Sequence, residues 1–504
     1  MNNTINNVAP TILVIFGATG DLIARKIAPA LFYLYKAGKL PTMFRVVGVA
    51  RREFTDEAFR EHLKTSFAKY VGAQDKPFGF AQDKDSDPTD FLNSFVYHQG
   101  LLDTDLCYSS LAERLRKIDE EWGVCTNKLF YLAVPPELYK GIFEHLAASG
   151  LTVSCGEEGG RIPLEAEARC EPSRLLTGWT RVLVEKPFGS DLKTAIELDE
   201  LLGTLFKETQ IYRIDHYLAK EMIQNILSFR FANNLFEDNW NAKHIERIDI
   251  RFFETLGLEE RGAFYDGVGA LVDVGQNHVL QMLALVTMER PRSYNAETIR
   301  EERARILEHL IIVNESDVAE KTFRAQYDGY TFIKGVEPHS ITETYFKVMT
   351  LLGLSRWKGV PIMLEGGKRM GEVKKEIVIT FKHPEPCLCP KGNETHHKNK
   401  VIIGLGPNEG IAIQFWSKKP GLDFEMEERT FDFVLRKEKR GVQYVEEYEK
   451  LLLDCILGEQ MLFVSTDEVK AMWRFIDPIV RVWKKGTEIV PLHSYTPDSN
   501  AIIE

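Results

Sequence analysis

The stretch TILVIFGATGDLIARKIAPALFYLYKAG, residues 11–38, decides the fold class of this chain. The apolar run at residues 12–16 ends at Gly17 and is typical of a strand buried in a parallel sheet. Apolar residues then recur at helical spacing over residues 21–37, and Gly38 follows as a stop signal. The stretch therefore predicts a strand, a tight glycine turn and a helix in succession.

The same alternation of strands and helices continues to about residue 190. Short apolar runs at residues 46–50, 129–134 and 182–184 predict further buried strands. A helix between them is indicated by the spacing of Phe59, Leu63, Phe67 and Val71. Strands that alternate with helices indicate an α/β domain with a doubly wound parallel sheet.

After about residue 240 the pattern changes to that of an antiparallel sheet. Ile248, Ile250 and Phe252 alternate with Asp249 and Arg251, as in a half-buried strand. Similar strands are predicted near residues 346–352, 376–382, 400–405, 411–416 and 430–435, and long helices at 444–458 and 467–484. The second half is therefore predicted to be an α+β domain.

The composition is that of a globular protein with an acidic charge balance. The 504 residues include 63 Lys and Arg against 74 Asp and Glu, a formal net charge of -11. This charge argues against a protein that coats nucleic acid or an anionic membrane. No apolar run reaches the roughly 18 residues needed to span a bilayer. The first ten residues are polar without a basic region, so we expect a cytoplasmic protein.

The cysteines do not predict a disulfide framework, because the seven of them are thinly spread. Cys387 and Cys389 are close together, and His396 and His397 lie nearby. A zinc site is the alternative to an irregular loop here, but the loop is the preferred interpretation. We therefore expect no metal.

Gly17 and Gly20 frame the turn before the first helix, where a pyrophosphate group can bind. Glycine lets the backbone approach the phosphates, and the helix N-terminus supplies amide donors. A tight turn that binds nothing is the alternative. The second strand ends in Arg51 and Arg52, where NADP-binding proteins place arginine and NAD-binding proteins a carboxylate. Together with Lys26 these arginines favour NADP, and ordinary surface charges are the alternative.

The segment RIDHYLAKE, residues 213–221, gathers titratable side chains. If it is helical, His216 and Lys220 lie one turn apart on one face, with Tyr217 close to them. Imidazole, phenol and ammonium groups together suit a phosphate monoester. The alternative is a solvated charged helix.

Two further motifs carry groups suited to chemistry. DVGQNH, residues 273–278, places His278 just before a long apolar run. An embedded histidine is more often a core residue, but histidine is well suited to remove an alcohol proton near neutral pH. EKPFG, residues 185–189, ends a strand, and strand ends of such sheets face the ligand crevice. The bond between Lys186 and Pro187 is a candidate cis peptide bond.

These motifs together resemble the glucose-6-phosphate dehydrogenase family. GATGDL, EKPFG, RIDHYLAKE, DVGQNH and WRFIDP stand in the family's order, and the similarity runs from Thr11 to about Trp483. The resemblance implies an NADP-binding Rossmann domain over residues 1–212. It further implies an α+β domain over 213–504 with a large antiparallel sheet, through which members associate as homodimers or homotetramers.

The resemblance also implies a reaction and its residues. Glucose 6-phosphate is expected to be oxidised to 6-phosphoglucono-1,5-lactone by hydride transfer to NADP, the first step of the oxidative pentose phosphate pathway. His278 is expected to be the catalytic base, and Asp215 to orient it and stabilise its charged form. The expected substrate-binding residues are Lys186, His216, Tyr217, Lys220, Glu254, Asp273 and Lys368. The expected cofactor-binding residues are Gly17, Ala18, Thr19, Gly20, Asp21, Leu22, Lys26, Arg51, Tyr139 and Lys186.

The chain departs from the family pattern near the substrate residues. Five residues after Lys368 the family tends to have a second basic contact, whereas this chain has Val373, followed by Lys374 and Lys375. Either phosphate binding is weaker here or Lys374 substitutes. Gly406 stands where members often have glutamine.

Two charged stretches, residues 72–87 and 156–178, look inserted and are predicted to be solvated loops. The second precedes the strand that delivers Lys186, so one alternative is a catalytically silent binder of NADP or a sugar phosphate. Another is a Rossmann oxidoreductase for an unphosphorylated sugar, since such proteins also end a strand in Lys-Pro. The groups of RIDHYLAKE argue against the latter, and the retained base and carboxylate argue against the former.

Overall fold

The computed structural model describes residues 9–70, 88–154, 178–258, 261–386, 397–435 and 446–502. Residues 72–87 and 156–177 of the two predicted insertions, and also Cys387, Cys389 and His396, lie outside these residues. The chain divides into two compact units. The first comprises Met1–Gly189, Lys193–Ala219 and Gly441–Thr466, and the second comprises Ser190–Leu192, Lys220–Arg440 and Asp467–Glu504. The first unit therefore extends past the predicted boundary at residue 212 and includes a segment that the sequence places in the second domain.

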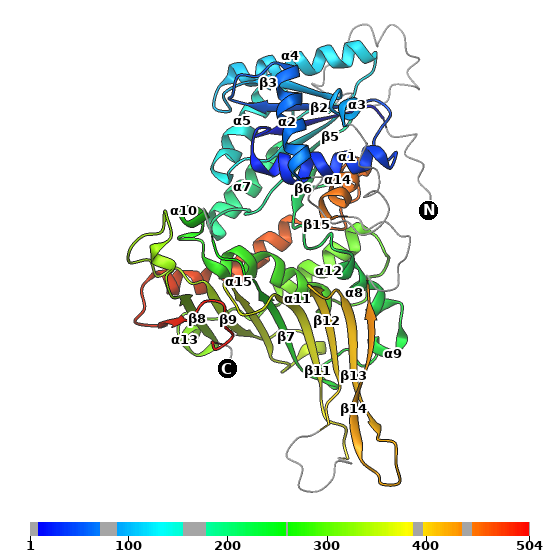
Figure 1. The fold of residues 1–504 in the computed structure, drawn as a ribbon, viewed down its shortest axis with the longest axis vertical. Coiled ribbons are helices and arrows are strands. Elements are labelled where there is room, and N and C mark those ends of the chain that lie inside the picture. The colour runs from blue at the N-terminus through cyan, green and yellow to red at the C-terminus, as the bar shows by residue number, and fades with distance from the viewer. Residues whose placement is uncertain are drawn as a thin grey trace. The chain divides into compact units, whose positions relative to one another are not determined.

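The first unit is built on a mainly parallel sheet (Figure 1). In the described residues its strands are β1 (Thr11–Phe16), β2 (Phe44–Ala50), β3 (Phe95–Gln99), β4 (Asn127–Leu132), β5 (Thr180–Val184), β6 (Ile211–Ile214) and β15 (Phe463–Val464). Their spatial order is β15-β6-β5-β4-β1-β2-β3. All neighbours pair in parallel except β15, which is antiparallel to β6. The chain thus winds outward in both directions from β1 and β4, which confirms the predicted doubly wound sheet.

Helices connect these strands. They are η2 (Ile23–Ile27), α1 (Ala28–Lys36), α2 (Asp56–Tyr70), α3 (Thr89–Leu92), α4 (Asp105–Trp122), η3 (Pro136–Leu138), α5 (Tyr139–Ala148), α7 (Leu192–Leu205), η4 (Glu208–Gln210) and α14 (Glu447–Leu457). The helix predicted over residues 21–37 is confirmed, with the π-helical turn η2 inside it. All six residues of β1 are buried, which explains its continuous apolar run.

The second unit contains a larger, mostly antiparallel sheet. Its described strands are β7 (Ile245–Phe253), β8 (Thr322–Tyr327), β9 (Tyr345–Thr350), β10 (Ile362–Gly367), β11 (Lys374–Phe381), β12 (Lys400–Gly406), β13 (Gly410–Lys418), β14 (Met426–Val434) and β16 (Leu492–Tyr495). Their order is β14-β13-β12-β11-β7-β10-β9-β8-β16. The predicted large antiparallel sheet is confirmed, and two of its strand pairs are parallel, β10 with β7 and β16 with β8.

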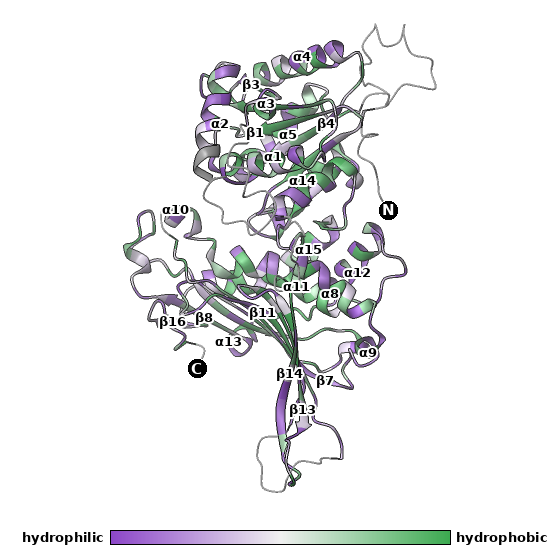
Figure 2. Cartoon of the chain, turned by 45° about the vertical axis from the view of Figure 1, so that its right-hand side comes forward, coloured by the Kyte–Doolittle hydropathy of each residue, from purple (hydrophilic) through white to green (hydrophobic). Residues whose placement is uncertain are grey.

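The helices of the second unit are α8 (Glu221–Phe231), α9 (Asn234–Glu237), α10 (Gly262–Tyr265), η6 (Leu271–Val279), α11 (Leu280–Thr287), α12 (Ala296–Glu308), α13 (Val318–Lys321), η7 (Tyr330–Phe332), η8 (Ser355–Trp357) and α15 (Thr466–Lys484). Figure 1 shows α8, α11, α12 and α15 along one face of the sheet. The edge strand β14 is mostly exposed and largely hydrophilic (Figure 2). Among the described residues no helix combines the length and the hydropathy needed to cross a bilayer.

Candidate active site

In the first unit, the expected site residues gather at one edge of the parallel sheet. Gly17 follows β1, Arg51 follows β2, Lys186 comes just after β5 and Asp215 follows β6. Because these strands run in the same direction, their carboxyl ends share an edge. Ligands of doubly wound sheets bind at that edge.

The turn after β1 is shaped by its two glycines. Gly17 has a φ of +85°, and a Cβ atom there would lie 2.4 Å from the carbonyl oxygen of Ala133. The N–H of Gly20 donates to the carbonyl of Gly17 at 2.9 Å, which closes the turn. Gly20 is exposed at the start of the helix, so no side chain at that position blocks the helix N-terminus. The turn therefore fits the pyrophosphate of a dinucleotide.

The other expected residues of this turn differ in exposure. Ala18 is buried, whereas Thr19 and Leu22 are half-buried. Asp21 is exposed, and its carboxylate pairs with the guanidinium group of Arg25 at 3.0 Å. The turn thus offers backbone groups more than side chains to a ligand.

Arg51 is held at the end of β2 by a core tyrosine. The hydroxyl of Tyr97 donates to the carbonyls of Ala50 and Arg52 at 3.0 and 2.6 Å, on either side of Arg51. The side chains of Arg51 and Lys26 are exposed. The backbone position of Arg51 is therefore fixed while its charge stays accessible to an anion.

The segment that presents Lys186 is fixed by buried tyrosines. The bond between Lys186 and Pro187 is cis, which confirms the suggestion from the sequence. The preceding Glu185 accepts hydrogen bonds from the hydroxyls of Tyr131 at 2.6 Å and Tyr448 at 3.0 Å. Burial raises the pKa of the Glu185 carboxyl group despite these two donors.

Tyr139 is another buried tyrosine that contacts the segment of Lys186. Its side chain is buried, and its hydroxyl donates to the backbone carbonyl of Glu185 at 2.9 Å. The structure therefore gives Tyr139 a positioning contact next to Lys186, and its contact with a cofactor stays a prediction.

The segment from Asp215 to Lys220 connects β6 to α8. Residues 216–219 form a turn, so the helical arrangement that the sequence left open does not occur there. The carboxylate of Asp215, which is 1% exposed, accepts the N–H of Tyr217 at 3.0 Å. The ring centroids of His216 and Tyr217 lie 4.9 Å apart, and the ring of Tyr448 stacks on that of His216 with a centroid distance of 6.5 Å.

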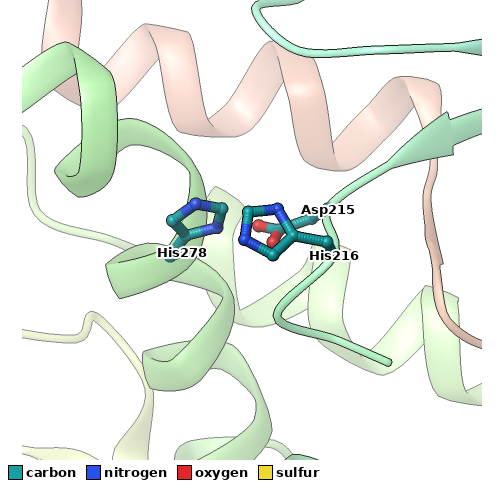
Figure 3. Close-up of side chains that lie close together, drawn as sticks. All are labelled: Asp215, His216 and His278. Carbon is teal, nitrogen blue, oxygen red and sulfur yellow. The ribbon is translucent and has the colours of Figure 1, made fainter. Parts of the chain in front are cut away.

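His278 lies on η6, a π-helix, and is 2% exposed. The ring of Phe252 stacks on its imidazole with a centroid distance of 5.8 Å. Figure 3 shows His278 on this helix, with Asp215 and His216 on the segment after β6. Burial is compatible with a core histidine and with a catalytic base. The π-helix favours the catalytic base, because π-helical turns occur frequently at functional sites.

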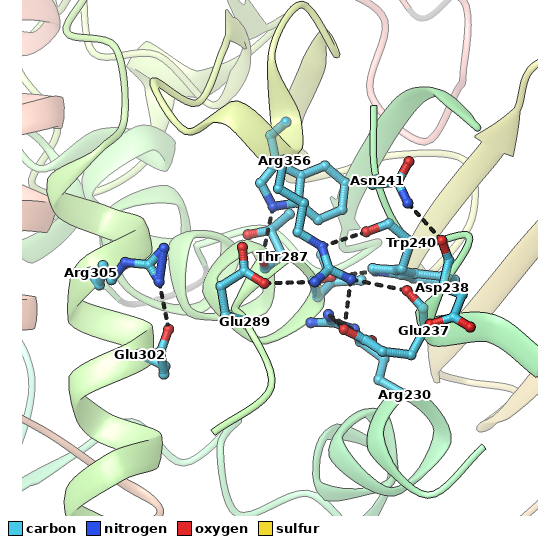
Figure 4. Close-up of polar contacts among 12 residues, drawn as sticks. Arg230, Glu237, Asp238, Trp240, Asn241, Thr287, Glu289, Glu302, Arg305 and Arg356 are labelled. Atoms are coloured by element: carbon cyan, nitrogen blue, oxygen red, sulfur yellow. Dashed lines mark hydrogen bonds and ion pairs between the residues drawn. The ribbon is translucent and has the colours of Figure 1, made fainter. Parts of the chain in front are cut away.

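The helix that carries His278 continues into α11, whose C-terminal end is anchored by polar side chains (Figure 4). Its last carbonyls accept hydrogen bonds from Arg230 to Leu285 at 3.2 Å, from Trp240 to Val286 at 2.7 Å and from Trp357 to Thr287 at 2.8 Å. Arg356 adds ion pairs with Glu237 and Glu289, both at 2.6 Å. The carbonyls of a helix end have no partners within the helix. These contacts therefore fix the position of the helix.

Lysines and carboxylates of the second unit form a cluster at one end of the central strands β7, β10 and β11. Lys368 follows β10 and lies 3.0 Å from Glu254 and 3.1 Å from Asp273. Lys375 on β11 lies 3.2 Å from the second carboxylate oxygen of Glu254. Burial disfavours the charged forms of Glu254 and Lys368. Nevertheless, Lys368 and Lys375 lower the pKa of Glu254, and the carboxylates of Asp273 and Glu254 raise the pKa of Lys368. Glu254 and Lys368 thus favour the charged form of each other.

Lys220 begins α8 as its N-cap residue, and its ammonium group lies 3.9 Å from the buried carboxylate of Glu409. Lys374, the residue considered as a substitute for the missing basic contact, instead pairs with the half-exposed Glu372 at 3.3 Å. Sequence reasoning therefore considered Lys374 where the structure favours the neighbouring Lys375, and it did not assign Glu409 to the site.

A doubly wound sheet with a glycine turn, joined to an α+β domain with a histidine and a lysine–carboxylate cluster, defines a nicotinamide-dependent oxidoreductase. Residues 14–225 match the family described as "Glucose-6-phosphate dehydrogenase, NAD binding domain", and residues 227–501 match "Glucose-6-phosphate dehydrogenase, C-terminal domain". The chain belongs to the glucose-6-phosphate dehydrogenase family.

Individual relatives agree with this assignment. The glucose-6-phosphate 1-dehydrogenase of Aggregatibacter actinomycetemcomitans is 40% identical over 486 residues, which cover 94% of this chain and 91% of the relative. The enzyme of Bacillus subtilis is 36% identical and covers 96% of this chain and 94% of the relative. A solved glucose-6-phosphate dehydrogenase in complex with glucose 6-phosphate has a TM-score of 0.82 at 32% identity, and covers 97% of this chain and 94% of that one.

Proposed function

We propose that this protein oxidises D-glucose 6-phosphate to 6-phospho-D-glucono-1,5-lactone with NADP as the hydride acceptor. The observation that carries the proposal is the similarity to a dehydrogenase solved with glucose 6-phosphate, which extends over nearly the whole chain. The reaction is the first step of the oxidative pentose phosphate pathway. The cytoplasmic location and the homodimer or homotetramer expected from the sequence stay predictions.

In the proposed mechanism His278 removes the proton from the C1 hydroxyl of the sugar. The oxygen then forms a double bond to C1 as the hydride leaves C1, so a neutral base at this oxygen lowers the barrier. Asp215 orients His278 and stabilises the charged imidazolium. The nicotinamide, when bound, supplies the carbon that accepts the hydride.

The remaining predicted residues bind the substrate at fixed positions. His216, Tyr217 and Lys220 hold the phosphate, and Lys186 contacts both the sugar and the cofactor. Glu254 and Asp273 bind sugar hydroxyls. Lys368, which pairs with both carboxylates, also contacts the substrate. The ion pairs of Lys368 with both carboxylates support this arrangement, because they fix the carboxylates before the sugar binds. A phosphate held away from the reacting carbon then fixes the position of C1.

Initial rates of nicotinamide reduction test the proposal directly. We expect reduction of NADP with glucose 6-phosphate and far slower reduction with free glucose, because the phosphate contributes binding energy at a site remote from C1. The arm with NAD measures cofactor preference. Equal rates with free glucose would favour an oxidoreductase for an unphosphorylated sugar. Saturable NADP binding without turnover would favour a silent binder.

Replacement of Arg51 by alanine tests the preference for NADP. We expect the KM for NADP to rise about tenfold while the KM for NAD stays unchanged, because a charged hydrogen bond to the 2′-phosphate is lost. The matched control is Arg116→Ala, which removes an exposed arginine from α4. Equal losses for NAD and NADP in Arg51→Ala would mean that Arg51 does not bind the 2′-phosphate.

A further inference from the structure

Two consecutive lysines, Lys374 and Lys375, begin β11, and their side chains point to opposite faces of the sheet. Successive side chains of a strand point to opposite faces of a sheet. Lys374 pairs with Glu372 at 3.3 Å, and the two side chains are 38% and 50% exposed. The side chain of Lys375 is only 16% exposed, and its ammonium group lies 3.2 Å from Glu254. Lys375 is therefore the lysine that faces the site.

The sheet register brings Lys375 close to the position of the proposed base. Lys375 pairs with Phe252 of β7, and its ammonium group lies 4.4 Å from the centroid of the Phe252 ring. The same ring stacks on the imidazole of His278. A cation at this distance from an aromatic ring is held by the ring electrons as well as by its carboxylate. Lys375 is thus fixed by two contacts within the second unit.

Lys375 lies within electrostatic range of two other lysines. Burial lowers the pKa of Lys375, and the positive charges of Lys220 and Lys368 lower it further, against the opposite effect of Glu254. Each of these lysines also has a carboxylate partner, Glu254 and Asp273 for Lys368, Glu254 for Lys375 and Glu409 for Lys220. The terminal oxygens of a sugar phosphate are hydrogen-bond acceptors, so one phosphate group can accept from both Lys220 and Lys375.

We propose that Lys375 is a substrate-binding residue whose ammonium group, beside Lys220, binds the phosphate of glucose 6-phosphate. Lys375 thus supplies the second basic substrate contact that the family tends to have five residues after Lys368, where this chain has Val373. The proposal rests on the proposed function, because it names a residue of that same substrate site. It also replaces the earlier candidate Lys374, whose ammonium group pairs with Glu372.

A purely structural role makes different predictions. If Lys375 only supports Glu254, its loss disturbs the binding of sugar hydroxyls and leaves the affinity for inorganic phosphate unchanged. If it binds the phosphate, its loss weakens the binding of the sugar phosphate and of inorganic phosphate together. Inorganic phosphate is therefore the probe that separates the two roles.

The experiment compares Lys375→Met and Lys375→Gln with the matched control Lys374→Met in the full chain. Two readouts are used, the KM for glucose 6-phosphate and the dissociation constant of inorganic phosphate from calorimetry. For both Lys375 variants we expect each constant to rise about 10- to 100-fold, with kcat close to that of the wild type. Lys375→Arg keeps the charge and is expected to retain most of the phosphate affinity, and Lys374→Met to match the wild type.

Unchanged phosphate affinity in both neutral Lys375 variants would overturn the proposal, as would an equal loss in Lys374→Met. Thermal unfolding identifies a variant that does not fold, and the other neutral substitution then decides. Failure of the proposed function is recognised separately. In that case the wild type binds phosphate in a Lys375-dependent way but does not reduce NADP with glucose 6-phosphate.

Discussion

Replacement of His278 by asparagine is expected to lower kcat by about 10²- to 10⁴-fold, while the KM for glucose 6-phosphate changes little. The reason is that a general base acts in the transition state, where the C1 hydroxyl loses its proton, and contributes little to ground-state binding. Asparagine has a similar size and polarity but accepts no proton at neutral pH. The measurement is kcat and KM with saturating NADP.

A buried histidine outside the site provides the matched control for this variant. His98 is 7% exposed, and its ring nitrogen lies 3.1 Å from the carbonyl oxygen of Cys107. His98→Asn therefore disturbs a core of the first unit without touching the proposed base. We expect it to change thermal stability more than kcat. Turnover near the wild-type level in His278→Asn would exclude His278 as the base.

The sequence predicts the first sheet well because its signals are local. Each buried parallel strand, such as β1 and β4, is a short apolar run followed by a helical pattern. The second sheet is harder, because β10 is buried along nearly its whole length and ends in Gly366 and Gly367. It shows neither alternation nor a clear strand signal. Its parallel pairing with β7 is set by tertiary packing, which no local pattern encodes.

The same distinction applies to the site. Gly17, Arg51 and Lys186 were predictable because strand ends of a doubly wound sheet share one edge. Whether residues 213–221 are helical stayed open in the sequence, because spacing alone does not distinguish one helical turn from a tight turn after a strand. Tyr448 reaches Glu185 from a distant segment, so no local signal could identify this contact. Strand alternation, by contrast, could have distinguished Lys375 from Lys374.

Glu343 provides the second large expected effect, on the pH dependence of stability. Its side chain is 7% exposed and accepts the N–H of Leu271 at 2.9 Å, at the start of the π-helix that carries His278. A Cβ atom on Gly269 would lie 2.2 Å from the same carboxylate. Burial raises the pKa of Glu343 from 4.5 to about 7.

The sign of the pH effect follows from this direction. The carboxyl group of Glu343 has a higher pKa in the folded chain than in the unfolded chain. As the pH rises, it therefore loses its proton at a lower pH in the unfolded chain. The stability that this group contributes is therefore fully present below the unfolded pKa near 4.5 and is lost as the pH rises through about 7. The full difference amounts to roughly 3 kcal/mol.

Replacement of Glu343 by glutamine removes this titration, and its amide oxygen can still accept the N–H of Leu271. We expect the free energy of unfolding of Glu343→Gln, relative to the wild type, to improve by roughly 2 to 3 kcal/mol between pH 5 and pH 8. Urea unfolding of both proteins at the two pH values measures it, and other groups that titrate in this range cancel in the comparison. Glu337→Gln, at an exposed position of the same loop, is the control and is expected to show no such change. Parallel stability curves for the wild type and Glu343→Gln would contradict the raised pKa, because a carboxyl group that titrates alike in both states contributes nothing to the slope of stability with pH.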